Sequence, residues 1–156
     1  MNTRYASDRT RPVHLRPRNL ALVGLGGVLG TAGREGLGLV IPTLGVLPLS
    51  TWCVNVAGAF LLGMFLEALS RRGPDEGRRR SIRLLVGTGL LGGFTTYSAL
   101  ATETVLLLNS GSIGWAIGYS IGTVVVGGVA SWLGIVVAAR IHDQHQRNDS
   151  QTAEVK

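Results

Sequence analysis

The chain has 156 residues, a length that suits a single domain. Hydrophobic residues make up 46% of the chain and charged residues only 15%, well below the roughly 25% that is usual in soluble domains. This composition predicts a small polytopic membrane protein. The net charge of +6 does not indicate a nucleic-acid-binding protein, because no basic face with interleaved aromatic residues is present.

Four apolar stretches follow one another along the chain, each long enough to cross a bilayer, which takes roughly 20 residues. They cover residues 19–41, 49–69, 82–108 and 113–139. We therefore expect an all-α membrane protein with a four-helix transmembrane domain over residues 19–139. A basic tail, residues 1–18, precedes this domain, and a polar tail, residues 140–156, follows it.

Positive charge is segregated to one side of this predicted topology. Five arginines lie in the first tail, six in the loop after the second stretch and at its edge, and three Lys or Arg residues in the last tail. The only exception is Arg34, which lies late in the first stretch. Because loops rich in Lys and Arg stay in the cytoplasm, this bias predicts that both termini are cytoplasmic and that the protein lies in the plasma membrane.

The third stretch has unusual chemistry at its centre, where the sequence reads GGFTTYS over residues 92–98. Two adjacent glycines loosen the backbone, and the hydroxyl groups that follow can satisfy backbone groups freed by a broken helix. A helix broken at mid-membrane presents carbonyls and N–H groups at the depth of an ion site. The alternative is an ordinary glycine-rich helix whose Ser and Thr side chains bond to its own backbone.

Each isolated polar residue in the apolar stretches has a structural and a functional interpretation. Arg34 is either a residue whose charge reaches the membrane interface or an anion-attracting charge at a vestibule. Asn55 either links two helices or donates N–H to a permeating anion. Glu103 lies two helical turns after Thr96 and either pairs with a cation, caps a pathway or lies near an interface. Thr123 is either a helix-bonded hydroxyl or an ion ligand.

An enzyme would need a polar catalytic cluster, and the apolar stretches contain none. The three histidines lie in the tails, without metal-ligand spacing or a Ser/His/Asp set. Cys53 lies alone in an apolar run, so the sequence has neither a disulfide framework nor a thiolate metal site. We therefore expect that the protein is not an enzyme.

Three segments together resemble the CrcB/Fluc family of fluoride channels. GGVLGTAGR at residues 26–34 is similar to the family's GGxxGAxxR. PLSTWCVNVAGAFLLG at residues 48–63 is similar to its PxGTxxVNxxGxFxxG, and GGFTTYS to its GGxTTFS. The resemblance covers about residues 20–138, and three motifs in this order are specific.

The resemblance implies a dual-topology dimer, in which two antiparallel subunits enclose two narrow fluoride pores. It also implies a structural Na⁺ at the dimer centre, held by the backbone carbonyls of Gly92 and Thr95. Hydroxyl and amide donors and the positive edges of aromatic rings would replace the water around fluoride. The residues implied in the ion pathway are Arg34, Asn55, Thr96, Tyr97, Ser98, Glu103 and Thr123.

The chain departs from the family where the usual TTFSTF becomes TTYSAL. Tyr97 keeps a ring edge and adds a hydroxyl group, Ala99 loses a hydroxyl group, and Leu100 has no ring. The charge bias is also too strong for one chain that inserts both ways. We therefore hypothesise that the chain inserts one way and pairs with an oppositely oriented homologue in a heterodimer, although a homodimer is the alternative.

Two other functions compete with this interpretation. A proton-coupled exporter of the small multidrug type would need a carboxylate deep within a span, whereas Glu67 and Glu103 lie toward span ends. A structural membrane protein without transport would not need the Arg, Asn and TTxS residues together. A requirement for a proton gradient would distinguish the exporter from the channel.

Overall fold

The computed structural model describes residues 16–41 and 48–154. The first 15 residues of the predicted basic tail, residues 42–47 and the last two residues lie outside the described part. The described chain is helical and contains no strand, which confirms the all-α prediction. Its helices are α2 (Pro17–Val40), α3 (Leu49–Ser70), α4 (Gly77–Ile82), the π-helix η2 (Arg83–Leu91), α5 (Gly92–Phe94), α6 (Tyr97–Asn109) and α7 (Ile113–Glu154).

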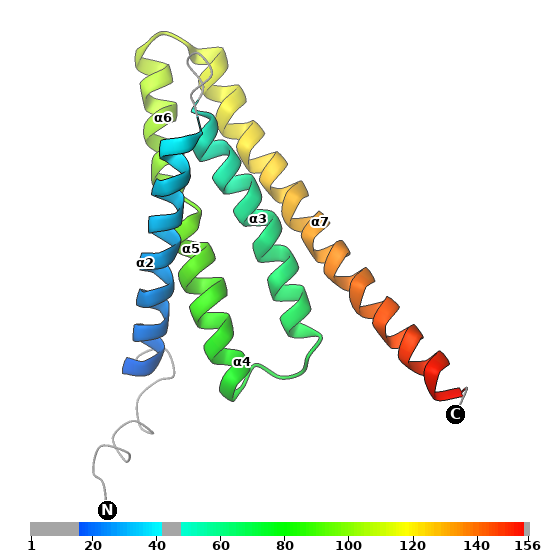
Figure 1. The fold of residues 1–156 in the computed structure, drawn as a ribbon. Helices are drawn as coiled ribbons and strands as arrows, with labels where there is room; N and C mark the ends of the chain where they lie inside the picture. Colours follow the sequence, from blue (N-terminus) through cyan, green and yellow to red (C-terminus); the bar gives the residue numbers. More distant parts are fainter. Residues whose placement is uncertain (1–15, 42–47, 155–156) are drawn as a thin grey trace, which may run out of the picture.

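The helices form two packed pairs (Figure 1). α2 lies along η2 and α5, while α3 packs mainly against α7. The described ends of the chain and α4 lie at one end of the molecule, and the turn between α6 and α7 lies at the other. This arrangement puts the basic loop and the described parts of both predicted tails on the same side.

Three helical segments are long and apolar enough to cross a membrane, namely Leu49–Ser70, Gly77–Asn109 and Ile113–Arg147. α2 is not among them, since its 24 residues include seven glycines together with Arg34 and Glu35. That α2 forms a fourth span is still a prediction. α7 continues as a helix to Glu154, well beyond residue 139 where the predicted span ends.

Glycines bring α2 into direct backbone contact with η2 and α5. A Cβ atom built on Gly26 would overlap the carbonyl oxygen of Leu85, and one on Gly93 would lie 2.5 Å from the carbonyl oxygen of Gly27. Gly30 meets the carbonyl of Leu90 in the same way. Small residues allow such close helix packing in membranes, where dispersion contacts replace the hydrophobic effect.

We expect Gly26→Ala to lower the free energy of unfolding by about 1–3 kcal/mol, because the added methyl group must push α2 and η2 apart. Gly24→Ala is the matched control, since a Cβ atom there meets nothing within 4 Å. Alanine is the better helix former, so this control should be neutral or slightly stabilising. Thermal unfolding in detergent measures both variants, and equal effects would contradict the close contact.

The turn between α6 and α7 shows how the sequence ends one helix and begins the next. Gly111 has a φ angle of +77°, a left-handed conformation that is typical of the residue after a helix end. The N–H of Ser112 donates to the carbonyl of Leu107 at 2.9 Å. This closes α6 and lets α7 return antiparallel to it.

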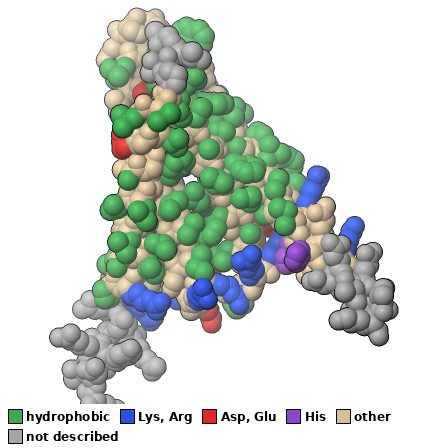
Figure 2. Space-filling model, viewed as in Figure 1, with side chains coloured by type: hydrophobic (Ala, Val, Ile, Leu, Met, Phe, Trp, Pro, Cys, Tyr) green, Lys and Arg blue, Asp and Glu red, His purple; other side chains and the backbone are tan. Residues whose placement is uncertain are grey.

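Arginine side chains gather along the end of the molecule that carries α4 and the start of α2, beneath a largely hydrophobic surface (Figure 2). One carboxylate, Asp75, lies among them. Its Oδ2 atom is 2.9 Å from Nη2 of Arg83 and 3.8 Å from Nε of Arg80. Arg71, directly after α3, forms ion pairs with Glu67 of α3 and Asp143 of α7. These ion pairs link α7 to the end of α3.

Candidate functional site

The helical chain is interrupted between α5 and α6, within the GGFTTYS segment. Thr95 has φ and ψ angles of −76° and 152°, and Thr96 has −145° and 119°, so both have extended backbone. The π-helix η2 ends directly before α5. Because π-helical turns are rare and often mark functional sites, the local backbone points to this region as the candidate site.

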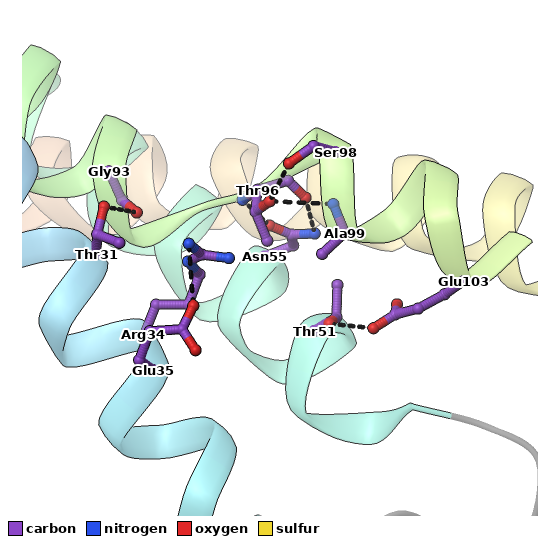
Figure 3. A network of polar contacts seen from close by, with 10 residues as sticks. All are labelled: Thr31, Arg34, Glu35, Thr51, Asn55, Gly93, Thr96, Ser98, Ala99 and Glu103. Carbon is purple, nitrogen blue, oxygen red and sulfur yellow. Dashed lines mark hydrogen bonds and ion pairs between the residues drawn. The ribbon is translucent and has the colours of Figure 1, made fainter.

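Asn55 of α3 bridges the interruption with both ends of its carboxamide (Figure 3). Its Nδ2 donates to the carbonyl of Thr96 at 2.9 Å, and its Oδ1 accepts from the N–H of Thr96 at 2.7 Å. A half-buried backbone N–H and C=O that lack helical partners need such bonds, because unpaired polar groups are costly away from water. Asn55 therefore links two elements, as one interpretation of the sequence proposed, and its second Nδ2 hydrogen is not used in this bridge.

Two backbone carbonyls lose their normal helical donors at the interruption. In a continuous α-helix the N–H of Thr96 would donate to Gly92, but here it donates to Asn55. The N–H of Ala99 would donate to Thr95, but it donates to Oγ1 of Thr96 at 3.2 Å instead. The carbonyls of Gly92 and Thr95, the two predicted metal ligands, are therefore both released from the helix pattern.

Carboxylate, imidazole and thiolate groups do not form a metal site in the part of the chain that the structure describes, because no three of these side chains lie together. Carbonyl oxygens are hard ligands, and the released carbonyls of Gly92 and Thr95 are suitable in chemistry for a small hard cation. Gly92 is also exposed on the surface of the single chain.

Thr96 caps the start of α6 and leaves its own hydroxyl hydrogen available. Its Oγ1 accepts from the N–H of Ala99 and lies 3.2 Å from Oγ of Ser98. Ser and Thr are favoured helix N-caps for this reason. The cap uses only a lone pair of this oxygen, so the Thr96 hydroxyl hydrogen can still donate to Ser98 or to a bound anion.

An open hollow of about 330 Å³ lies where the interruption meets α3 and α7. It brings together four of the predicted pathway residues and one predicted metal ligand, and it is lined by Asn55, Ala59, Leu62, Thr95, Thr96, Tyr97, Leu100, Thr123, Val124 and Gly127. No acidic residue is among these lining residues. Thr123 is 4% exposed, and its hydroxyl donates to the carbonyl of Tyr119 at 2.6 Å.

The two positions that depart from the family's aromatic pattern have opposite environments. Tyr97 is 81% exposed, whereas Leu100 is 7% exposed and packs in a small core with Leu107, Ala116 and Tyr119. Leu100 is therefore a packing residue of the single chain, and the Tyr97 ring extends from its surface.

Glu103 lies outside the hollow and joins three helices. Its Oε1 accepts from Oγ1 of Thr51 at 2.6 Å, and its Oε2 accepts from the Tyr119 hydroxyl at 2.5 Å. Thr51 and Tyr119 are 8% and 7% exposed. Sequence reasoning did not select either partner, although Thr51 lies one helical turn before Asn55 and Tyr119 one turn before Thr123, so each shares a helix face with a selected residue.

Arg34 also lies outside the hollow. Its Nη2 is 3.2 Å from Oε1 of the neighbouring Glu35 (Figure 3). The Arg34 side chain is 25% exposed, and its Nε atom is buried without a hydrogen-bond partner among the described residues. On the same helix, Thr31 donates to the carbonyl of Gly93 at 3.3 Å, so α2 contacts the backbone directly before the interruption.

Comparison with known proteins identifies the family of the chain. The family model described as CrcB-like protein, Camphor Resistance (CrcB), matches residues 21–135. A relative from Leifsonia xyli subsp. xyli, named fluoride-specific ion channel FluC 2, is 50% identical over 130 residues, which are 83% of this chain and 90% of that protein.

Two further relatives have similar names and coverage. Fluoride-specific ion channel FluC 1 of Cutibacterium acnes is 45% identical over 80% of this chain and 86% of its own length. Fluoride-specific ion channel FluC of Thermus thermophilus is 45% identical over 72% of this chain and 89% of its own length. All three names are those of ion channels and none is that of an enzyme, in agreement with the sequence prediction. This chain is a multi-pass membrane protein that belongs to the CrcB family.

Proposed function

We propose that this chain is a subunit of a fluoride-selective channel that lowers cytoplasmic fluoride by passive efflux across the plasma membrane. The observation that supports this proposal best is the hollow at the helix interruption. Its polar lining consists of amide and hydroxyl groups, with no acidic residue among the described residues that line it. The names of the similar proteins support fluoride as the ion.

The chemistry of the hollow suits a small, strongly hydrated anion. Such an ion must exchange water for aligned donors, because a polar or charged group without partners is costly in a membrane. The second N–H of Asn55 is an available donor near the interruption, and so is one of the Thr96 and Ser98 hydroxyl groups, since these two bond to each other. The Tyr97 ring edge and hydroxyl add a positive edge and a further donor. Thr123 would join this set if its hydroxyl turned away from the Tyr119 carbonyl.

Arg34 and Glu103 would act outside this set of donors. The Arg34 charge, once its contact with the exposed Glu35 opens, would raise the local concentration of anions near the first helix. Glu103 would hold Thr51 and Tyr119 in place and would not contact the ion.

Passive flow needs no proton-binding carboxylate in the hollow. A membrane potential that is negative inside drives an anion outward by about 2.3 kcal/mol per 100 mV. A channel of this kind therefore lowers cytoplasmic fluoride without an exchange partner, whereas an exporter would need a titratable group on the pathway.

The complete pore would form between two antiparallel subunits. Tyr97 is 81% exposed and the hollow is open on one side, so a second subunit could complete the wall. Around the dimer centre, the Gly92 and Thr95 carbonyls of each subunit would supply four hard oxygen ligands to a structural Na⁺. When bound, the ion would supply positive charge that holds the two interruptions together.

We infer a cytoplasmic location for both termini. In this topology α2 is the fourth span, and it is less apolar than the other three because of its glycines and charged residues. Apart from Arg34, all 14 Lys and Arg residues fall on one side of this topology. A chain with this bias inserts one way, so the antiparallel partner would be a homologous subunit in a heterodimer. Reporters at each terminus test this, and equal populations of the two orientations would contradict it.

Fluoride efflux from liposomes that contain the purified chain tests the proposed function, with chloride as the control anion. Alone, the chain should give little efflux, and addition of an oppositely oriented homologue should give fast fluoride-selective efflux. Fast efflux from the chain alone would favour a homodimer. Efflux that requires a proton gradient, or no efflux with any homologue, would contradict the channel.

Sodium binding can be tested without a transport assay. We expect the thermal unfolding temperature of the assembled protein in detergent to be higher in NaCl than in KCl at equal ionic strength, because a ligand that binds only the folded state stabilises it. Lithium and potassium controls test the preference for a small cation. Equal unfolding temperatures in all three salts would contradict a Na⁺ site at Gly92 and Thr95.

A further inference from the structure

A groove that shares no lining residue with the hollow lies at the basic end of the molecule. It has a volume of about 490 Å³ and opens between the start of α2 and the start of η2. Its apolar wall consists of Leu20, Val23 and Leu84, with Thr88 deeper along η2. Asn19, Asp75, Arg80 and Arg83 line the rest. The groove therefore combines a hydrocarbon-like wall with a charged rim.

Asp75 holds the two rim guanidinium groups in place without using all of their donors. Arg80 donates through Nε and Nη2 to the carbonyl of Asp75 at 3.0 and 2.8 Å. Arg83 donates through Nε to Oδ2 of Asp75 at 3.0 Å, and its Nη2 lies 2.9 Å from the same oxygen. Since a guanidinium carries five N–H groups, the Nη1 groups of both arginines are not used by Asp75.

The net charge of the rim is positive, because two guanidinium groups face one carboxylate. Arg79, whose Nη1 is buried without a hydrogen-bond partner among the described residues, lines a second hollow that shares Asp75 and Arg83 with the first. A phosphate diester supplies one negative charge and oxygen acceptors for these donors. The rim is therefore complementary in charge to a phosphodiester.

The position of the groove indicates that this phosphate belongs to a membrane lipid. Leu20 and Val23 lie at the start of the predicted first span and Leu84 at the start of the third, so the wall begins where the apolar spans meet the basic loop. Figure 2 shows that Lys and Arg side chains gather at this end of the molecule, beneath a largely hydrophobic surface. At this level a membrane presents lipid headgroups with acyl chains beside them, and basic clusters there recognise anionic lipids.

We propose that this groove binds an anionic phospholipid of the cytoplasmic leaflet, with the phosphate at Arg80 and Arg83 and an acyl chain along Leu20, Val23 and Leu84. The proposal does not depend on fluoride conduction. It requires only that the chain spans the membrane with its basic loop in the cytoplasm.

Native mass spectrometry of the full chain in neutral detergent tests this proposal, with phosphatidylglycerol titrated against phosphatidylcholine of the same acyl chains. Phosphatidylglycerol should bind in a saturable way and phosphatidylcholine should not. Arg80→Gln with Arg83→Gln should raise the half-saturating phosphatidylglycerol concentration about twenty-five-fold, since each interfacial arginine contributes about fivefold to the affinity for an anionic lipid.

Arg72→Gln with Arg78→Gln is the matched control, because it removes the same charge from exposed positions of the same loop that do not line the groove. It should change phosphatidylglycerol binding by about threefold or less, since exposed charges are screened. If both double variants weaken binding equally, the loop attracts lipid through diffuse charge and the groove is not a site.

Thr88→Trp tests the apolar part of the groove without a change in charge. Thr88 is exposed, so the larger ring should be tolerated in the fold while it fills the path of the acyl chain and weakens phosphatidylglycerol binding. Unchanged binding by this variant would overturn the proposal. Competition by glycerol phosphate as effective as that by the intact lipid would also overturn it, because the site would then bind free phosphate.

Discussion

Asn55→Ala is expected to abolish fluoride efflux by the assembled channel and to lower its free energy of unfolding by about 2–5 kcal/mol. The change leaves the N–H and C=O of Thr96 without partners, and each unsatisfied backbone group that is shielded from water costs about 1–3 kcal/mol. The extended segment that positions the Thr95 carbonyl, the Thr96 hydroxyl and the Tyr97 ring would lose its contact with α3. Liposome efflux and thermal unfolding in detergent measure the two effects.

Asn109→Ala is the control for this change, because it removes the same carboxamide from the exposed end of α6. It should leave both efflux and stability unchanged. An Asn55→Ala protein with normal stability would contradict the bridge to Thr96. A variant that still conducts fluoride at the normal rate would remove Asn55 from the ion pathway.

Glu103→Ala is expected to lower the free energy of unfolding by about 2–4 kcal/mol, because two short hydrogen bonds to a charged acceptor are lost from α3 and α7 together. Hydrogen bonds to charged groups contribute about 1.5–3 kcal/mol each, and the Thr51 and Tyr119 hydroxyls can recover part of this by bonding to each other. Glu76→Ala, at an exposed position of the loop, is the matched control and should have little effect.

A double-mutant cycle with Tyr119→Phe separates this interaction from general damage to the fold. Tyr119→Phe removes only the hydroxyl group, so most of its cost should disappear in the Glu103→Ala background. We expect a coupling energy of about 1–3 kcal/mol between residues in direct contact. Strictly additive effects would show that Glu103 and Tyr119 act independently.

Several helix ends follow from local sequence signals, whereas the end of α7 at Glu154, 15 residues beyond the predicted end of the span, does not. Pro48 before Leu49, Gly73-Pro74 after α3 and Gly111 after α6 mark helix ends that the structure also has. Such signals act through the backbone of a few neighbouring residues, so they can be read without the fold. The π-helix of η2 has no comparable signal in its own nine residues.

The candidate site could be predicted as a set of residues but not as a set of contacts. Asn55 and Thr96 are 41 positions apart, and nothing in either segment predicts that one carboxamide takes both backbone groups of Thr96. The sequence analysis includes Glu103 among the residues of the ion pathway, and it does not predict that Glu103 bonds to Thr51 of α3 and Tyr119 of α7. These pairings depend on how the helices cross, which is a property of tertiary packing.

The length of α7 has a practical consequence for imaging so small a protein. Its 42 residues correspond to about 63 Å of helix, roughly twice the thickness of the hydrocarbon core. The part after residue 139 would therefore stand about 22 Å beyond the predicted span as an unbroken rod, tied at its base by the contact between Arg71 and Asp143. A rigid domain fused in helical register after Glu154 would move with the membrane domain and serve as a fiducial mark for electron cryomicroscopy.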